Sequence, residues 1–359
     1  MGLFKKKRSF IAIDIGGGSV KLMELDTRGE KPYLLNATIT PISHSAFANN
    51  QITKKESVAE KISAALLGRD KDSVAVAVAM PAPAVFTKKL TMAEMDPKEL
   101  LTTIRFEASS YIPQGVDTVR LDYSILNRKP NGELEVLVVA VKNEIVESFL
   151  DTISLAGYET AIVDVDYFAL QNAFENAYPH LISKPVCLVH VGTRYSFINI
   201  CKDGISLFTG NVALGGMSVT QEIAKAMEVE LVEAEKLKQG FKLEDSSTDP
   251  KLTEVITKAR KSLVSDLDRQ IRIMWNASGA DEDISSIFLS GGGSLLPNLD
   301  TDLSALAGVS CELMDPFHGF EIGEEFDRSY IKKLSPSMTI AAGLAIRRFG
   351  DKAKGGIVG

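Results

Sequence analysis

The amino-acid sequence predicts an α/β fold with two matching lobes and a smaller inserted block. Two β-hairpin patterns each carry glycines at the turn, a third glycine-rich turn follows a later strand, and a segment with its own strands and helices separates the two hairpins. A chain of 359 residues also exceeds what one hydrophobic core usually organises. We therefore expect two or more subdomains.

The first hairpin lies near the start of the chain. The strand pattern of residues 10–15 stops at Gly16, Gly17, Gly18 and Ser19, and resumes in the following residues. No helix pattern follows these glycines. A P-loop or a Rossmann fingerprint places its glycines before a helix N-terminus, so the sequence favours a hairpin turn over either motif.

The second hairpin repeats this pattern in the other half of the chain. A strand pattern reaches Gly192 and Thr193 and turns back into residues 195–200. A further strand follows, and Gly215 and Gly216 then open a predicted helix. The two halves of the sequence therefore echo each other.

Between the hairpins lies a block with its own elements, residues 80–157. Its predicted helices span 96–111 and 143–156, and its predicted strands span 120–126 and 133–141. The chain then returns to a strand at 162–165 and a helix at 167–176. This return indicates an inserted subdomain.

The rest of the chain is mostly helical. Residues 219–276 predict amphipathic helices that form a lid, interrupted by a polar loop at 244–250. A strand at 284–289 leads into the third glycine-rich turn, residues 290–294. The last predicted helix spans 339–349.

Composition excludes several classes of protein. A net charge of −7 argues against a nucleic-acid footprint, and three scattered cysteines and four dispersed histidines give no disulfide framework or zinc motif. The apolar runs fall well short of the ~20 residues of a membrane helix. The basic start, residues 5–8, is followed by Asp14 and glycines rather than a signal-peptide core, which predicts a cytoplasmic protein. The basic run is either a solvated terminus or a contact for anionic lipid.

The glycine turns suggest one shared anionic ligand. Glycine allows close backbone approach, so three such turns can gather amides around phosphate, although each alone is ordinary turn chemistry. Asp14 could order water around a magnesium ion, and Ser19 and Lys21 could contact the same phosphates. For Lys21, an outward strand position is the alternative.

At these residues the sequence resembles the actin/Hsp70/FtsA superfamily. Residues 14–21 are similar to its first phosphate loop, 190–193 to its second, 289–294 to its adenosine loop and 339–345 to its second connecting helix. The resemblance implies an actin-like (ribonuclease H-like) two-lobed fold. His190 stands where the superfamily usually has Asp, and imidazole is a poor magnesium partner, which implies ATP binding with slow or absent hydrolysis. Alternatively, His190 is only structural and Asp14 keeps the metal.

More narrowly, the chain resembles the PilM family of type IV pilus assembly proteins, relatives of FtsA. The supporting text is residues 107–113, 163–166, 214–216 and 234–238, the last similar to an element that approaches the nucleotide base and ribose. For Glu235 and Lys238, an intrahelical ion pair is the alternative. The nucleotide-binding residues that the turns and the resemblance imply are Asp14, Gly16, Gly17, Gly18, Ser19, Lys21, Gly192, Thr193, Gly215, Gly216, Glu235, Lys238, Gly291, Gly292, Gly293 and Ser294.

The resemblance also implies the subdomain limits. They are 1–79 and 158–185 for subdomain 1A, 80–157 for an FtsA-type inserted subdomain 1C, 186–225 and 284–334 for 2A, 226–283 for 2B, and 335–359 for the closing helix of 1A and the tail.

It further implies ATP and magnesium as cofactors, with Asp14 holding the metal through water, and no confident catalytic residue. The implied partners are the cytoplasmic N-terminal peptide of a PilN-like inner-membrane protein, bound between 1A and 1C, and the pilus motor ATPases. The resemblance also allows a homo-oligomer or ring, and it places the protein at the inner membrane through its partner. The alternatives are an FtsA-like division protein, for which the glycine-rich residues 351–359 are a poor membrane helix, and an actin-fold small-molecule kinase, for which no catalytic base stands out.

Overall fold

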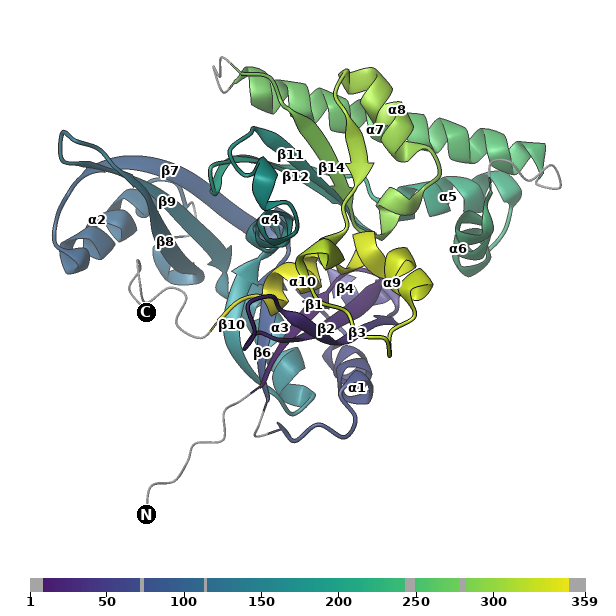
Figure 1. Cartoon of the computed structure of the whole chain (residues 1–359), viewed down its shortest axis with the longest axis horizontal. Helices are drawn as coiled ribbons and strands as arrows, with labels where there is room; N and C mark the ends of the chain where they lie inside the picture. The colour runs from purple at the N-terminus through teal and green to yellow at the C-terminus, as the bar shows by residue number, and fades with distance from the viewer. Residues whose placement is uncertain (1–8, 72–73, 113–114, 243–248, 278–281, 349–359) are drawn as a thin grey trace.

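The computed structural model describes residues 9–71, 74–112, 115–242, 249–277 and 282–348. Figure 1 shows two α/β lobes, one above the other, with a smaller unit to one side. The basic start, most of the polar run at 244–250 and the tail lie outside the described residues.

The first lobe is built on a five-stranded sheet in the order β10-β6-β1-β2-β3. Its strands are β1 (Ser9–Ile15), β2 (Ser19–Asp26), β3 (Tyr33–Pro41), β6 (Val74–Met80) and β10 (Glu159–Val165). The three strands β1, β6 and β10 run parallel, and β2 and β3 are antiparallel additions. Every residue of β6 is buried, as expected for a central parallel strand that is covered on both faces.

The second lobe repeats this topology. Its strands are β11 (Val186–Val191), β12 (Ser196–Lys202), β13 (Ile205–Val212), β14 (Ser286–Ser290) and β15 (Cys311–Leu313), in the order β13-β12-β11-β14-β15. Here too a hairpin and a third strand run antiparallel beside parallel strands. The predicted echo between the two halves is therefore confirmed.

Two helices fill the space between the sheets. Helices α4 (Asp166–Ala177) and α10 (Thr339–Ala345) contribute to one core with apolar residues of both sheets. They cross so closely that a Cβ on Gly343 would overlap the carbonyl oxygen of Ala169. Glycine is therefore required at this crossing, because any side chain would force the helices apart.

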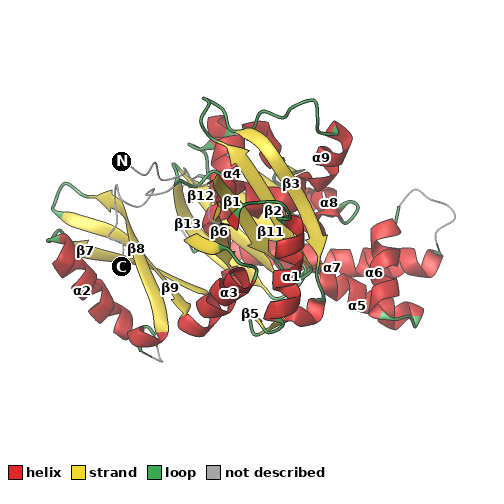
Figure 2. Cartoon of the chain, turned by 90° about the horizontal axis from the view of Figure 1, so that it is seen from below, coloured by secondary structure: helices red, strands yellow, loops and turns green. Residues whose placement is uncertain are grey.

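The remaining helices cover the outer faces of the sheets (Figures 1 and 2). Apolar residues of α1 (Lys55–Ala65) and α3 (Asn143–Leu155) share a core with the first sheet. The second sheet is covered by α5 (Gly216–Met227), α7 (Pro250–Asn276) and α8 (Leu299–Ala307), with α6 (Leu231–Gly240) beside α5. Helix α9 (Arg328–Leu334) precedes α10.

The smaller unit has a sheet and a core of its own. Strands β7 (Val85–Ala93), β9 (Glu133–Lys142) and β8 (Val119–Arg128) pack against α2 (Pro97–Ser109), with Leu100, Ile104 and Val136 buried between them. Helix α3, which the sequence analysis placed in the inserted block, packs instead in the core of the first lobe.

A short hairpin, β4 (Phe47–Ala48) and β5 (Gln51–Ile52), lies beside α3.

In the part of the chain that the structure describes, no helix is long and apolar enough to cross a membrane. Cys187, Cys201 and Cys311 are all free thiols.

Candidate functional site

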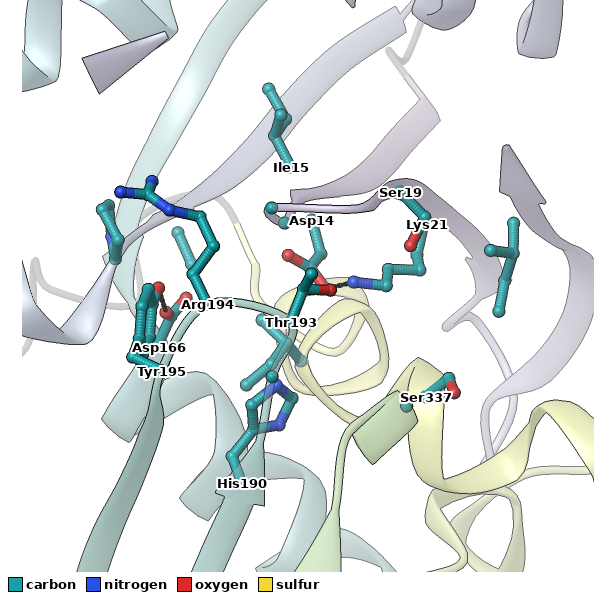
Figure 3. A pocket seen from close by; sticks show the side chains of 18 residues that line it. Asp14, Ile15, Ser19, Lys21, Asp166, His190, Thr193, Arg194, Tyr195 and Ser337 are labelled. Atoms are coloured by element: carbon teal, nitrogen blue, oxygen red, sulfur yellow. Dashed lines mark hydrogen bonds and ion pairs between the residues drawn. The ribbon is translucent and has the colours of Figure 1, made fainter. Parts of the chain in front are cut away.

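The first glycine turn places a carboxylate and an ammonium group side by side in the cleft between the lobes (Figure 3). Asp14 and Lys21 lie directly opposite each other on β1 and β2, and the distance from Lys21 Nζ to Asp14 Oδ2 is 3.1 Å. Directly opposite residues of a strand pair share a face. Lys21 therefore faces the cleft, and its outward alternative is excluded.

The second turn meets the first across the cleft. A Cβ on Gly18 would lie 2.8 Å from Thr193 Oγ1, so the two turns are in contact. The carbonyl oxygens of Gly192 and Thr193 accept the backbone N–H groups of Gly216 and Met217, each at 2.8 Å. The start of α5 is thereby fixed against the second turn.

The third turn requires glycine for its shape. Gly291 has a φ of +84°, and its N–H donates to the carbonyl oxygen of Pro336 at 2.6 Å. A Cβ there would also overlap the carbonyl oxygen of Val191, which follows His190. Gly292 lines the cleft, whereas Ser294 is buried and donates to the carbonyl oxygen of Gly291 at 2.6 Å.

Glu235 and Lys238 lie beside the start of α5. Lys238 Nζ is 2.7 Å from Glu235 Oε2, so the intrahelical ion pair is present. The same ammonium group also donates to the carbonyl oxygen of Gly216 at 2.9 Å and to Thr220 Oγ1 at 2.7 Å. The pair therefore joins α6 to the start of α5, which is bonded to the second turn.

His190 is neutral and held in place by its own lobe. Its Nδ1 lies 3.1 Å from Ser290 Oγ, and its ring stacks on Phe197 with a centroid separation of 4.9 Å. Burial, together with the positive charge of Lys21, lowers the pKa of His190 to about 3. At neutral pH the residue thus supplies neither a carboxylate nor a positive charge to the cleft.

Asp166 is a cleft residue that the sequence analysis did not select. Its Oδ2 accepts the N–H of Ala82 and the hydroxyl of Tyr195, both at 3.1 Å. Burial, and secondarily the negative charge of Asp14, raises the pKa of Asp166 to about 7. Because Tyr195 belongs to the second lobe, this hydrogen bond joins the lobes. Asp166 could have been found from its position directly after the parallel strand β10, since the carboxyl ends of such strands are common ligand sites.

The structure brings half of the predicted residues to the wall of one cavity. These are Asp14, Gly16, Gly17, Ser19, Lys21, Gly192, Thr193 and Gly292. Gly18 touches Thr193, and Gly215, Gly216, Glu235 and Lys238 form the adjoining layer, while Gly291, Gly293 and Ser294 shape the third turn. Besides Asp166, sequence reasoning missed Arg194, Tyr195 and Ser337, which also line the cavity.

The side chains of the cleft can hold a metal ion only together with a bound ligand that supplies further oxygen atoms. Among the described residues, no three His, Cys, Asp or Glu side chains converge as a metal-binding group. Asp14 is one hard oxygen donor, already paired with Lys21. A magnesium ion here would depend on water and phosphate oxygens for its other ligands.

A second depression lies where the inserted unit meets the first lobe. Its volume is about 590 Å³, and its rim carries amide side chains from the β4–β5 hairpin. It is lined by Asn49, Asn50, Gln51, Pro83, Ala84, Lys142, Glu144 and Ile145. We call this depression the junction groove.

Comparison with solved structures confirms the actin-like fold. The chain aligns over 95% of its length with 98% of a chain in the PilM-PilN type IV pilus biogenesis complex, at 23% identity and a TM-score of 0.84. It aligns with the ethanolamine utilization protein EutJ from Carboxydothermus hydrogenoformans at 14% identity and a TM-score of 0.58, over 95% of this chain and 89% of that one. MreB5 of Spiroplasma citri bound to AMPPNP gives 12% identity and a TM-score of 0.53, with 97% of each chain covered.

The family assignment rests on the sequence itself. The model of the type IV pilus assembly protein PilM matches residues 12–349, which includes both lobes, the inserted unit and the three glycine turns. The FtsA-like and kinase alternatives are not favoured by this match. The chain therefore belongs to the PilM family of type IV pilus assembly proteins.

Proposed function

We propose that this protein is a nucleotide-binding platform of the type IV pilus machine, which holds the cytoplasmic N-terminal tail of a PilN-like membrane protein. The observation that carries the proposal is the meeting of separate glycine turns around one cleft, in a chain of the PilM family. The related structure is described as a PilM-PilN complex, and another neighbour of the same fold is described as bound to AMPPNP.

ATP would lie between the lobes. The first and second turns and Lys21 would hold its phosphates, and the layer around Gly215, Gly216, Glu235 and Lys238 would hold the nucleoside end. The cavity volume is about 110 Å³, below the ~300–1,000 Å³ of common ligand pockets, so the lobes would separate to admit a nucleotide.

Magnesium would neutralise part of the phosphate charge when bound, with Asp14 holding it through water. The cleft offers a neutral imidazole at His190 where hydrolysis would benefit from a second carboxylate. The pKa of Asp166 is raised to about 7 by burial, and its carboxyl group already accepts two hydrogen bonds. We therefore propose nucleotide binding with slow or absent hydrolysis.

The junction groove is our proposed site for the tail. Its volume lies within the common range for ligand pockets, and its amide side chains can both donate and accept hydrogen bonds along a peptide backbone. Tail binding would hold the protein at the cytoplasmic face of the inner membrane. There it would contact the pilus motor ATPases, as a homo-oligomer or ring.

Two measurements test the proposal. Calorimetry should show binding of Mg-ATP while a steady-state assay shows little phosphate release. Rapid transfer of phosphate to a small-molecule acceptor would favour the kinase instead.

A synthetic peptide of the partner's cytoplasmic N-terminus should bind the wild type. Ala84→Arg, which fills the junction groove, should weaken peptide binding at least 10-fold, while Ala93→Arg at the exposed far end of β7 should not. Failure of the peptide to bind with and without ATP would remove the platform function.

A further inference from the structure

Arg194 crosses from the second lobe to the first. It follows Thr193 in the second glycine turn and lines the cleft. A Cβ on Gly17 would lie 2.8 Å from both Cγ and Cδ of Arg194, so the aliphatic part of this side chain rests on the first turn. Figure 3 shows it extending away from Lys21, on the other side of Asp14.

The guanidinium group has an aromatic partner rather than an acidic one. None of the ion pairs between described residues involves Arg194. Its Cζ lies 5.6 Å from the ring centroid of Phe47. A cation–π contact at a partly exposed site is weaker than a bidentate, charge-assisted hydrogen bond to phosphate. A phosphate in the cleft would therefore compete successfully for this guanidinium.

Phe47 connects the cleft to the junction groove. It begins the β4–β5 hairpin, whose turn residues Asn49 and Asn50 line that groove together with Gln51. The hairpin also packs on α3, where the Phe47 ring lies 6.2 Å from the Phe149 ring between centroids. One short hairpin thus has Arg194 at one end and the groove at the other.

We propose that Arg194 is a phosphate-binding residue that leaves Phe47 when nucleotide binds, and that this loosens the β4–β5 hairpin and weakens peptide binding in the junction groove. The inference rests on the proposed function, because it takes the cleft as the nucleotide site and the groove as the peptide site. A loosened wall must be ordered again when the peptide binds, which lowers its affinity. The expected coupling is about 5-fold or more in peptide affinity.

The test is hydrogen exchange of the backbone amides of residues 47–52 in the full chain, with and without Mg-ATP, alongside calorimetry. In the wild type, ATP should speed this exchange at least 5-fold and weaken peptide binding by a similar factor.

Arg194→Gln should bind ATP about 10-fold more weakly than the wild type, and its residues 47–52 should exchange rapidly both with and without ATP. Phe47→Leu should also exchange rapidly in both states, and it should bind ATP at least as tightly as the wild type, because Arg194 then has no cation–π contact to give up. Arg28→Gln and Phe106→Leu, at exposed arginine and phenylalanine residues outside the cleft, should behave as wild type.

The outcomes separate this inference from the function on which it rests. If ATP binds the wild type but the exchange of residues 47–52 does not change, the link through Arg194 is wrong although the nucleotide site stands. Wild-type ATP affinity in Arg194→Gln would likewise overturn the phosphate role. If ATP binds and alters the hairpin but the peptide does not bind, the partner assignment is wrong. The proposed link from the nucleotide through Arg194 to the hairpin then still stands. A wild type that binds no ATP overturns both.

Discussion

The two hairpins β1–β2 and β11–β12 have one topology and different chemistry. In each, the next-to-last residue of the first strand faces a directly opposite residue on the second: Asp14 faces Lys21, and His190 faces Phe197. The first pair is an ion pair at 3.1 Å, and the second is an aromatic stack with an interplanar angle of 16°. The strand-end pair of the first lobe therefore presents charge to the cleft, and that of the second lobe presents a neutral ring.

This difference separates what builds the fold from what equips the site. The apolar strand residues on both hairpins are buried, and they would form these sheets with either pair at the turn. The pair decides whether the strand end itself can engage a cation, whereas the positive charge of the second lobe comes from Arg194 on its turn. We expect substitutions in the two lobes to have unequal effects, and four experiments test that asymmetry.

The largest effect is expected where a glycine packs against backbone. A Cβ on Gly215 would lie 2.6 Å from the carbonyl oxygen of Gly192, whereas one on Gly16 would meet Lys21 Nζ at 2.8 Å, the mobile end of a long side chain. Gly215→Ala should lower the free energy of unfolding by about 3 kcal/mol and Gly16→Ala by about 1 kcal/mol or less. Urea unfolding measures both. Equal losses would mean that the second turn moves as easily as Lys21 does.

The next effect compares the two strand-end residues directly. Asp14→Asn should weaken Mg-ATP binding about 30-fold, because it removes the carboxylate closest to the proposed metal and the partner of Lys21. His190→Gln should change the same affinity by less than about 3-fold, since a neutral side chain replaces a neutral one. Calorimetry on both variants gives the two ratios. Similar losses in the two variants would contradict the division of roles between Asp14 and His190.

The third effect is a pH dependence that belongs to His190. Its pKa is about 3 in the folded protein and near 6.5 when unfolded, so below pH 6.5 the unfolded chain binds a proton that the folded one does not. Stability from this residue is complete above pH 6.5 and is lost as pH falls. The unfolding free energy of the wild type should drop by about 2 kcal/mol more than that of His190→Gln between pH 7.5 and 5. Parallel curves for the two proteins would show that His190 is protonated in the fold.

Much of the fold was predictable because it depends on short-range patterns. The hairpins, the helix at 96–111 and the strands at 120–126 and 133–141 follow apolar periodicity and turn residues, and the structure has them with ends within a few residues. The packing of α3 on the first lobe was missed. Its sequence predicts an amphipathic helix but does not say which sheet its apolar face meets.

The candidate site was predicted where glycines marked it. Gly16, Gly192 and Gly292 meet at the cleft because three strands end there, and strand endings are readable from sequence. Asp166, Arg194 and Ser337 were missed because their role comes from the approach of distant segments. Arg194 acquires its neighbours only when Gly17 and Phe47 are brought beside it. Such contacts have no periodic signal in one chain.

The smallest effect is expected at the outer layer of the second lobe, where charge supports backbone instead of facing the cleft. Glu235→Gln leaves Lys238 bonded to Gly216 and Thr220, and it removes a partly exposed ion pair of a kind worth about 0.5 kcal/mol. ATP affinity should fall 2- to 5-fold, with stability changed by less than about 1 kcal/mol. Calorimetry and urea unfolding check the two values. A loss above about 30-fold would equal that expected for Asp14→Asn, and would mean that Glu235 contributes to ligand binding as strongly as Asp14 does.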